Sequence, residues 1–140
     1  MGGLSPITIA AALIDDDKGR LLLVRKRNTK WFMQAGGKIE PGETAQDALR
    51  RELKEEIGLS IQDARLRYLG TFFAPAANEA DCVVDAALFH IRHSHLPIAK
   101  EEIEEAVWVS PDDALNLPLA PLTRDHVLPI ARTLQASRRP

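Results

Sequence analysis

The sequence predicts a single α/β domain in which helices pack on a mixed β-sheet. Three observations predict this fold: apolar stretches of strand length open the chain, one amphipathic helix interrupts them, and further strands lead to a closing helix. An order of strands, helix, strands and helix is typical of a layered α/β domain. Because we find no repeat, low-complexity tract or linker, we expect residues 1–140 to form one domain.

The first two strands are predicted at residues 7–14 and 20–27. Both are rich in apolar residues, and the acidic turn DDDKG between them predicts that they pair. A short strand at residues 31–34 then runs into a loop that begins with Ala35-Gly36-Gly37. Pro41-Gly42 marks the end of this loop.

The amphipathic helix is predicted to begin after Thr44 and to end at Gly58. Thr44 is a favoured N-cap, with Asp47 as a weaker form of the capping-box acid, and glycine is the usual C-terminal residue. Apolar residues repeat every four positions along this segment and predict one buried face: Ala45, Leu49, Leu53 and Ile57.

The second half of the chain predicts two paired strands at residues 64–74 and 81–91, joined by a turn rich in proline, alanine and asparagine. A charged loop containing EEIEE (101–105) and a short strand (106–110) come next. Ser110-Pro111 favours the start of a helical turn. The last helix is predicted at about residues 122–136, bent at Pro129.

Composition limits the classes of function. With 140 residues, 45% hydrophobic, 27% charged and a net charge of −2, the chain is typical of a soluble globular protein with no basic stripe for nucleic acid. The single cysteine, Cys82, excludes an intrachain disulfide and fits a reducing compartment. Since the amino-terminal stretch also lacks the features of a signal peptide or a membrane span, we expect a cytoplasmic protein.

The segment RRELKEEIG places Glu52, Glu55 and Glu56 at helical spacings that stack like charges on one face. A solvated helix surface is the ordinary explanation of such a face, and Arg51 with Glu55 would support it. A divalent cation would remove the repulsion, since Mg²⁺ prefers oxygen ligands and bridges carboxylates to phosphates. Gly36 and Gly37 could then bring bare backbone close to the same ligand.

The full spacing is more specific than the glutamates alone. Over GKIEPGETAQDALRRELKEEIGL, five residues separate Gly37 from Glu43, and seven more separate Glu43 from the triplet REL. The pairs EE and GL then follow, each after one further residue. This pattern resembles the Nudix box of the Nudix hydrolases, of the small MutT-like type. The resemblance implies an α/β/α layered Nudix fold, with the mixed sheet between helices, and a metal-dependent pyrophosphohydrolase.

The resemblance also implies roles for individual residues. Glu52, Glu55 and Glu56, with the carbonyl oxygen of Gly36, would hold Mg²⁺ or Mn²⁺. Glu43 and Arg51 would form an orienting pair that holds the loop onto the helix. The metal would neutralise the charge of the pyrophosphate and help to deprotonate water.

The general base and the substrate contacts are less constrained. The base would be a glutamate of the box, Glu55, or an acid from the later loop, where Glu105 and Glu104 come before Glu101 and Glu102 as candidates. Contacts to the substrate are expected from the strand end, the residue before the glycine loop and the loop itself: Arg25, Arg27, Gln34, Gly37 and Lys38. For the two arginines, a charged strand end that stays solvated is the favoured explanation.

We therefore predict hydrolysis of a nucleoside diphosphate linked to another moiety, with an unmodified or modified nucleoside triphosphate converted to monophosphate and pyrophosphate. Two alternatives remain open: an ADP-ribose or nucleotide-sugar pyrophosphatase, and a catalytically silent nucleotide-binding regulatory domain. The expected partner is a nucleotide-type small molecule, without nucleic acid or membrane. Related proteins are often dimers, so a homodimer also remains open.

Overall fold

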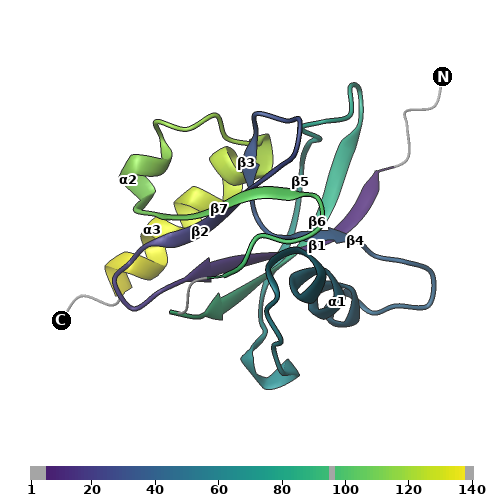
Figure 1. The fold of residues 1–140 in the computed structure, drawn as a ribbon, viewed down its shortest axis with the longest axis horizontal. Helices are drawn as coiled ribbons and strands as arrows, with labels where there is room; N and C mark the ends of the chain where they lie inside the picture. Colours follow the sequence, from purple (N-terminus) through teal and green to yellow (C-terminus); the bar gives the residue numbers. More distant parts are fainter. Residues whose placement is uncertain (1–5, 95–96, 138–140) are drawn as a thin grey trace.

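A computed structural model describes residues 6–94 and 97–137. Within these residues, one mixed sheet of seven strands runs in the order β3-β2-β1-β6-β5, with β4 paired to β1 and β7 paired to β2 (Figure 1). The strands are β1 (Ile7–Asp15), β2 (Leu21–Lys26), β3 (Phe32–Met33), β4 (Gly36–Lys38), β5 (Arg67–Pro75), β6 (Val83–Arg92) and β7 (Ile103–Val109).

Helices cover both faces of this sheet. The helical elements are α1 (Ala45–Ile57), the 3₁₀ turn η1 (Asp63–Arg65), α2 (Pro111–Ala114), the π-helical turn η2 (Thr123–Val127) and α3 (Leu128–Ser137). Two apolar clusters form the core, one under α1 and the other under α2, η2 and α3. The α/β layered fold expected from the order of elements is therefore confirmed. In the described residues, no helix is long and apolar enough to cross a bilayer.

Strand β1 lies at the centre of the sheet and is buried on both faces. Alternate residues contribute to the two clusters, with Ala10, Ala12 and Ile14 facing α1 and Ala11 and Leu13 facing the opposite layer. This explains its nearly unbroken apolar sequence, because a strand covered on both faces has no reason to alternate with polar residues. It pairs in parallel with β6 over its whole length.

The predicted limits of α1 are confirmed. The side-chain oxygen of Thr44 accepts a hydrogen bond from the backbone N–H of Asp47. Gly58 ends the helix in the left-handed conformation, with φ of 66°. Leu49, Leu53 and Ile57 are buried in the core. The apolar stripe thus fixes which face of α1 meets the sheet, and the acidic positions are left beside it.

Three expectations about local structure need correction. Residues 36–38 form strand β4, paired with β1, where a loop was predicted. The 103–105 part of the predicted EEIEE loop belongs to β7. The predicted closing helix contains the π-helical turn η2, which leads directly into α3 with Pro129 as its second residue. The first two differences share a cause, since pairing with β1 or β2 supplies hydrogen bonds that the local pattern of glycines or glutamates does not reveal.

A buried carboxylate joins the two parallel central strands. Asp15 at the end of β1 is 6% exposed and accepts hydrogen bonds from His90 and Arg92 of β6, both at 2.7 Å. Burial by itself raises the pKa of Asp15, but these hydrogen bonds and the positive charges outweigh it and hold the pKa below its ordinary value. The cluster therefore stabilises the sheet while Asp15 is ionised.

Candidate active site

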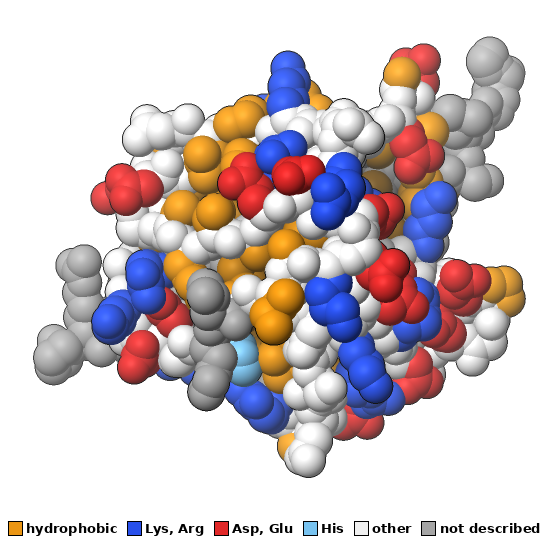
Figure 2. Space-filling model, in the orientation of Figure 1, with side chains coloured by type: hydrophobic (Ala, Val, Ile, Leu, Met, Phe, Trp, Pro, Cys, Tyr) orange, Lys and Arg blue, Asp and Glu red, His pale blue; other side chains and the backbone are white. Residues whose placement is uncertain are grey.

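Five carboxylates line one hollow of about 440 Å³, which we call the acidic hollow: Glu52, Glu55, Glu56, Glu101 and Glu102. The first three come from α1, and the last two come from the turn that leads into β7. Figure 2 shows acidic and basic side chains intermingled over α1. The fold therefore adds two acids to the three predicted together from the helix.

Two of these carboxylates have raised pKa values, so that their ionised form is less favourable than usual. Glu56 is 2% exposed, and this burial raises its pKa to about 8. The nearby charge of Glu52 also raises the pKa, whereas a 3.0 Å hydrogen bond from the backbone N–H of Gly36 lowers it. Burial also raises the pKa of Glu52. The hollow thus holds like charges that would be stabilised by a cation.

The two glycines of β4 are required for different reasons. Gly36 has φ of 150°, and a Cβ added there would lie 2.2 Å from the backbone oxygen of Ala10. At Gly37 an added Cβ would lie 2.4 Å from Cδ of Glu52. The first glycine lets β4 approach β1, and the second lets the carboxylate of Glu52 lie against the strand.

The expected pair of Glu43 and Arg51 is present. Nε and Nη2 of Arg51 donate to the two carboxylate oxygens of Glu43 at 2.8 and 2.9 Å, and Nη2 also donates to the carbonyl oxygen of Lys38. Hydrogen bonds from Arg51 are the main cause that lowers the pKa of Glu43 to about 2. Since Nη1 of Arg51 also donates to Glu52 at 2.7 Å, this arginine joins the loop, β4 and the acidic face of α1.

The donor set suits a hard divalent cation in its chemistry. All five side chains of the acidic hollow offer carboxylate oxygens, which Mg²⁺ prefers. Among the described residues, however, no three His, Cys, Asp or Glu side chains converge on one position in this conformation. Two of the acids have other partners in this conformation, since Glu52 accepts from Arg51 and Glu56 accepts from the Gly36 N–H.

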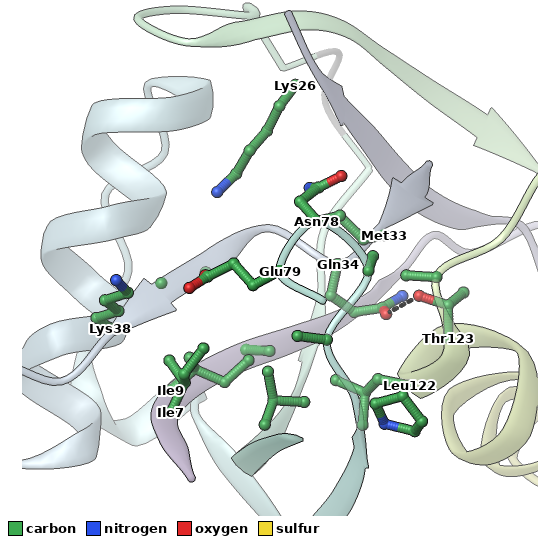
Figure 3. Close-up of a pocket in the computed structure, with 18 residues that line it drawn as sticks. Ile7, Ile9, Lys26, Met33, Gln34, Lys38, Asn78, Glu79, Leu122 and Thr123 are labelled. Carbon is green, nitrogen blue, oxygen red and sulfur yellow. Dashed lines mark hydrogen bonds between the residues drawn. The ribbon is translucent and has the colours of Figure 1, made fainter. Parts of the chain in front are cut away.

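A second hollow, which we call the cavity, adjoins β4 and has a volume of about 180 Å³ (Figure 3). Lys26 and Lys38 lie toward one end, and Gln34 and Thr123 lie at the other. Gly36 and Gly37 line the cavity and contact the acidic hollow through Glu56 and Glu52. The full lining is Ile7, Ile9, Ala11, Lys26, Met33, Gln34, Gly36, Gly37, Lys38, Pro75, Ala76, Ala77, Asn78, Glu79, Val84, Ala120, Leu122 and Thr123.

Of the three basic residues at the end of β2, the structure brings Lys26 to the site rather than the two predicted arginines. Nε of Arg25 donates to Glu105 at 2.9 Å, and Nη1 of Arg27 donates to Glu104 at 3.2 Å. Lys26 lines the cavity, and its Nζ lies 3.4 Å from the carboxylate of Glu102. Alternation along the strand could have separated Lys26 from its neighbours, but only the packed fold shows which face meets α1.

The same ion pairs determine where the acids of the later segment lie. Glu104 and Glu105, the first candidates for a base from a later loop, lie on β7, paired with Arg27 and Arg25 and outside the acidic hollow. Glu101 and Glu102 line the hollow in their place. The register between β2 and β7 shifts at Arg25 and Lys26, a bulge of the kind that redirects side chains next to sites.

Of the other predicted contacts, Gly37, Lys38 and Gln34 all line the cavity. Gln34 is 6% exposed, and its Oε1 accepts a 2.7 Å hydrogen bond from Oγ1 of Thr123 in η2. Sequence reasoning did not identify Thr123, and it named the two arginines rather than Lys26 among the expected contacts. Thr123 carries no local signal, because it lies 89 residues from its partner.

Comparisons with known proteins match most of this chain. A family model described as NUDIX domain matches residues 5–129. The CTP pyrophosphohydrolase of Escherichia coli (strain K12) is 33% identical over 121 residues, which cover 82% of this chain and 84% of that protein.

Solved structures extend the likeness to the whole fold. The MutT NUDIX hydrolase from Burkholderia pseudomallei superposes with a TM-score of 0.71 at 26% identity, covering 91% of this chain and 96% of that one. The NUDIX domain of Shewanella oneidensis NrtR, solved with ADP ribose, gives a TM-score of 0.74 at 18% identity, covering 94% and 90%. At that identity the second likeness concerns the fold alone.

Proposed function

The chain belongs to the NUDIX family of hydrolases, and on that premise we propose that it cleaves a nucleoside triphosphate into the monophosphate and pyrophosphate. As a Nudix pyrophosphohydrolase, it acts on phosphorus-containing acid anhydrides. We further propose that residues 1–140 form one such domain, of which the family model matches residues 5–129. Cytosine nucleotides are the first substrates to test, because a relative that is 33% identical is named for CTP.

One observation carries the proposal. The acidic hollow and the cavity meet at the two glycines of β4, so that one ligand can place its phosphates beside the carboxylates and its remaining part in the cavity. A binding-only domain has no need for buried, like-charged glutamates at this junction. The juxtaposition therefore supports a hydrolase more than a silent regulatory domain.

Nudix hydrolases generally need a divalent metal, and we propose Mg²⁺ for this chain. The ligands would be Glu52, Glu55, Glu56 and the carbonyl oxygen of Gly36. When bound, the cation would stabilise charge on the phosphate oxygens as a Lewis acid. The raised pKa values of Glu52 and Glu56 support the assignment, since burial makes the negative charge of both carboxylates costly and a bound cation would stabilise it.

The chain's own residues supply positioning and proton transfer. The Glu43–Arg51 pair would hold β4 and α1 together, and Lys26 and Lys38 would meet the phosphates at one end of the cavity. A water molecule attacks one phosphorus, the P–O bond of the anhydride breaks and pyrophosphate leaves. We assign the proton from that water to Glu55, because its side chain is the most exposed of the three on α1, at 51%, and its nearest cationic partner, Arg51, is 3.8 Å away.

A substrate panel with matched variants tests the proposal. Release of phosphate or pyrophosphate is measured for canonical-base and oxidised nucleoside triphosphates, ADP-ribose and nucleotide sugars, each with Mg²⁺ and again with EDTA. We expect a Mg²⁺-dependent triphosphatase yielding pyrophosphate. A response to ADP-ribose or a nucleotide sugar alone would establish the alternative substrate class, and binding without turnover would favour the silent domain.

Glu55→Gln and Glu56→Gln should each lower kcat about a hundredfold or more, because each replaces a carboxylate that would bind the cation at the reacting centre. Both should fold normally, since glutamine keeps the size of the side chain. Glu40→Gln, at an exposed loop position, is the matched control and should keep full activity. Turnover close to that of the control in both variants would overturn the metal assignment.

A further inference from the structure

Gln34 carries a buried donor that the protein itself does not use. Its side chain is 6% exposed and lines the cavity, yet Nε2 has no hydrogen-bond partner among the residues that the structure describes. The other half of the amide is satisfied, because Oε1 accepts from Oγ1 of Thr123 at 2.7 Å. A buried N–H without a partner is costly and rare in folded proteins, so the free half of this amide calls for an explanation.

A purely structural role explains only half of this arrangement. The hydrogen bond to Thr123 joins the segment between β3 and β4 to η2, which would account for the oxygen of the amide. It gives no reason for the N–H₂ group, a buried donor without a partner among the described residues, in a cavity whose lining includes Met33 and Leu122. The unused donor is explained if a ligand in the cavity supplies the acceptor.

The position of Gln34 indicates which part of a ligand it would meet. Figure 3 shows the Gln34–Thr123 hydrogen bond at the end of the cavity away from Lys38. The Lys38 end adjoins the acidic hollow through Gly37, where an added Cβ would touch Glu52. A ligand with its phosphates at the hollow therefore extends its uncharged end toward Gln34.

We infer that Gln34, held in orientation by Thr123, reads the base of the substrate and selects nucleotides whose base presents a carbonyl oxygen to its N–H₂ group. This inference rests on the proposed function and deepens it. A site that offers a buried donor disfavours a base lacking the acceptor, because the donor is then left unpaired.

The test pairs changes in the protein with changes in the base. Sulfur is a much weaker acceptor than oxygen, so UTP is compared with 2-thio-UTP and 4-thio-UTP, and CTP with its 2-thio form. Each substrate is assayed for kcat/KM with the wild type and with Gln34→Leu. Ribose 5-triphosphate, which has no base, provides the reference rate. The coupling between the two changes isolates the contact from general effects of either.

We expect one of the thio substitutions to lower kcat/KM of the wild type about five- to a hundredfold, the range for a buried donor left without its partner. In Gln34→Leu the ratio of oxo to thio substrate should fall close to one, and the preference for the nucleotide over ribose 5-triphosphate should shrink. Thr123→Val should weaken the discrimination partly, since the amide loses the group that orients it. Met33→Leu changes the same lining without a polar atom and should keep the oxo-to-thio ratio.

Three outcomes would overturn the inference. An unchanged ratio in Gln34→Leu means that the amide does not read the base. Equal losses on every substrate, with a lower melting temperature, mean that Gln34 is only structural. A response instead to removal of the amino group, tested with the 2-pyrimidinone analogue of CTP, means that the amide presents its oxygen.

Gln34→Met, which keeps the side-chain length, is the second variant and provides the same comparison if the leucine variant does not fold. Failure of the proposed function is distinguishable from these results. In that case neither the nucleotides nor ribose 5-triphosphate is cleaved by the wild type with Mg²⁺.

Discussion

Replacing Gly37 by alanine should strongly lower activity while leaving the fold intact. The added Cβ would lie 2.4 Å from Cδ of Glu52, and ordinary contact begins at 3.4 Å, so the carboxylate must move by about 1 Å. The backbone at Gly37 does not require glycine, and the side chain of Glu52 can rotate away. The clash is therefore relieved by moving the group that the reaction needs.

The size of the effect follows from this displacement. Misplacing a group at the reacting centre by about 1 Å costs about a hundredfold in rate, which corresponds to about 2.7 kcal/mol of activation free energy. We expect kcat of Gly37→Ala to fall by about that factor. Its free energy of unfolding, measured in urea, should stay within about 1 kcal/mol of the wild type.

Two neighbouring glycines are the controls. Gly36→Ala would press Cβ against the backbone oxygen of Ala10 at 2.2 Å and hold alanine at φ of 150°, so it should lose about 2–6 kcal/mol of stability. Gly42→Ala has φ of 84° with no atom within 4 Å, so it should lose about 1–2 kcal/mol and keep its kcat. The reasoning is refuted if Gly37→Ala keeps wild-type kcat, or if it unfolds as readily as Gly36→Ala.

Three further predictions concern charges. Lys26→Met should raise KM for a nucleoside triphosphate about tenfold, because it removes a cation from the cavity. Arg27→Met removes only an exposed ion pair and should leave KM unchanged. Equal KM values for the two variants would exclude a phosphate contact at Lys26. Asp15→Asn should lower the free energy of unfolding by about 1–3 kcal/mol at neutral pH. The pKa of Asp15 in the folded state lies below its ordinary value of 3.8, so the difference in unfolding free energy between wild type and variant should persist above pH 3.8 and disappear as the pH falls through the folded pKa. Urea unfolding at several pH values measures this difference, and a value that stays constant with pH would contradict the argument. Arg51→Lys should lower kcat about tenfold with little change in stability, since lysine cannot bind both oxygens of Glu43 at once, and a wild-type kcat would show that the two-point contact is dispensable.

The parts of the fold that depend on local signals could be predicted from the sequence. Thr44, the four-residue apolar spacing and Gly58 fix α1 by capping and burial, and the structure confirms all three. The parallel pairing of β1 with β6 was not predicted, because nothing near Ile7 indicates that its partner is Val84. Such contacts depend on how the layers close, which no local pattern contains.

The candidate site likewise has parts that local spacing predicts and parts that it does not. The carboxylates of α1 and the Glu43–Arg51 contact lie within one segment, so spacing was sufficient to bring them together. Glu104 and Glu105 were preferred to Glu101 and Glu102, because the sequence does not reveal the bulge between β2 and β7 that determines which glutamates lie near Lys26. Gln34 was identified as a contact, but its chemistry became clear only when packing placed Thr123 against it.

The central position of β1 also bears on how the chain folds as it is synthesised. Ile7 is synthesised well before its parallel partner Val84 on β6, so one edge of the apolar strand β1 stays unpaired until β6 has been synthesised. Parallel pairing between distant segments forms slowly, since the chain must close a long loop before any stabilising contact can form. We therefore expect this sheet to close late, after β6 has emerged and can pair with β1.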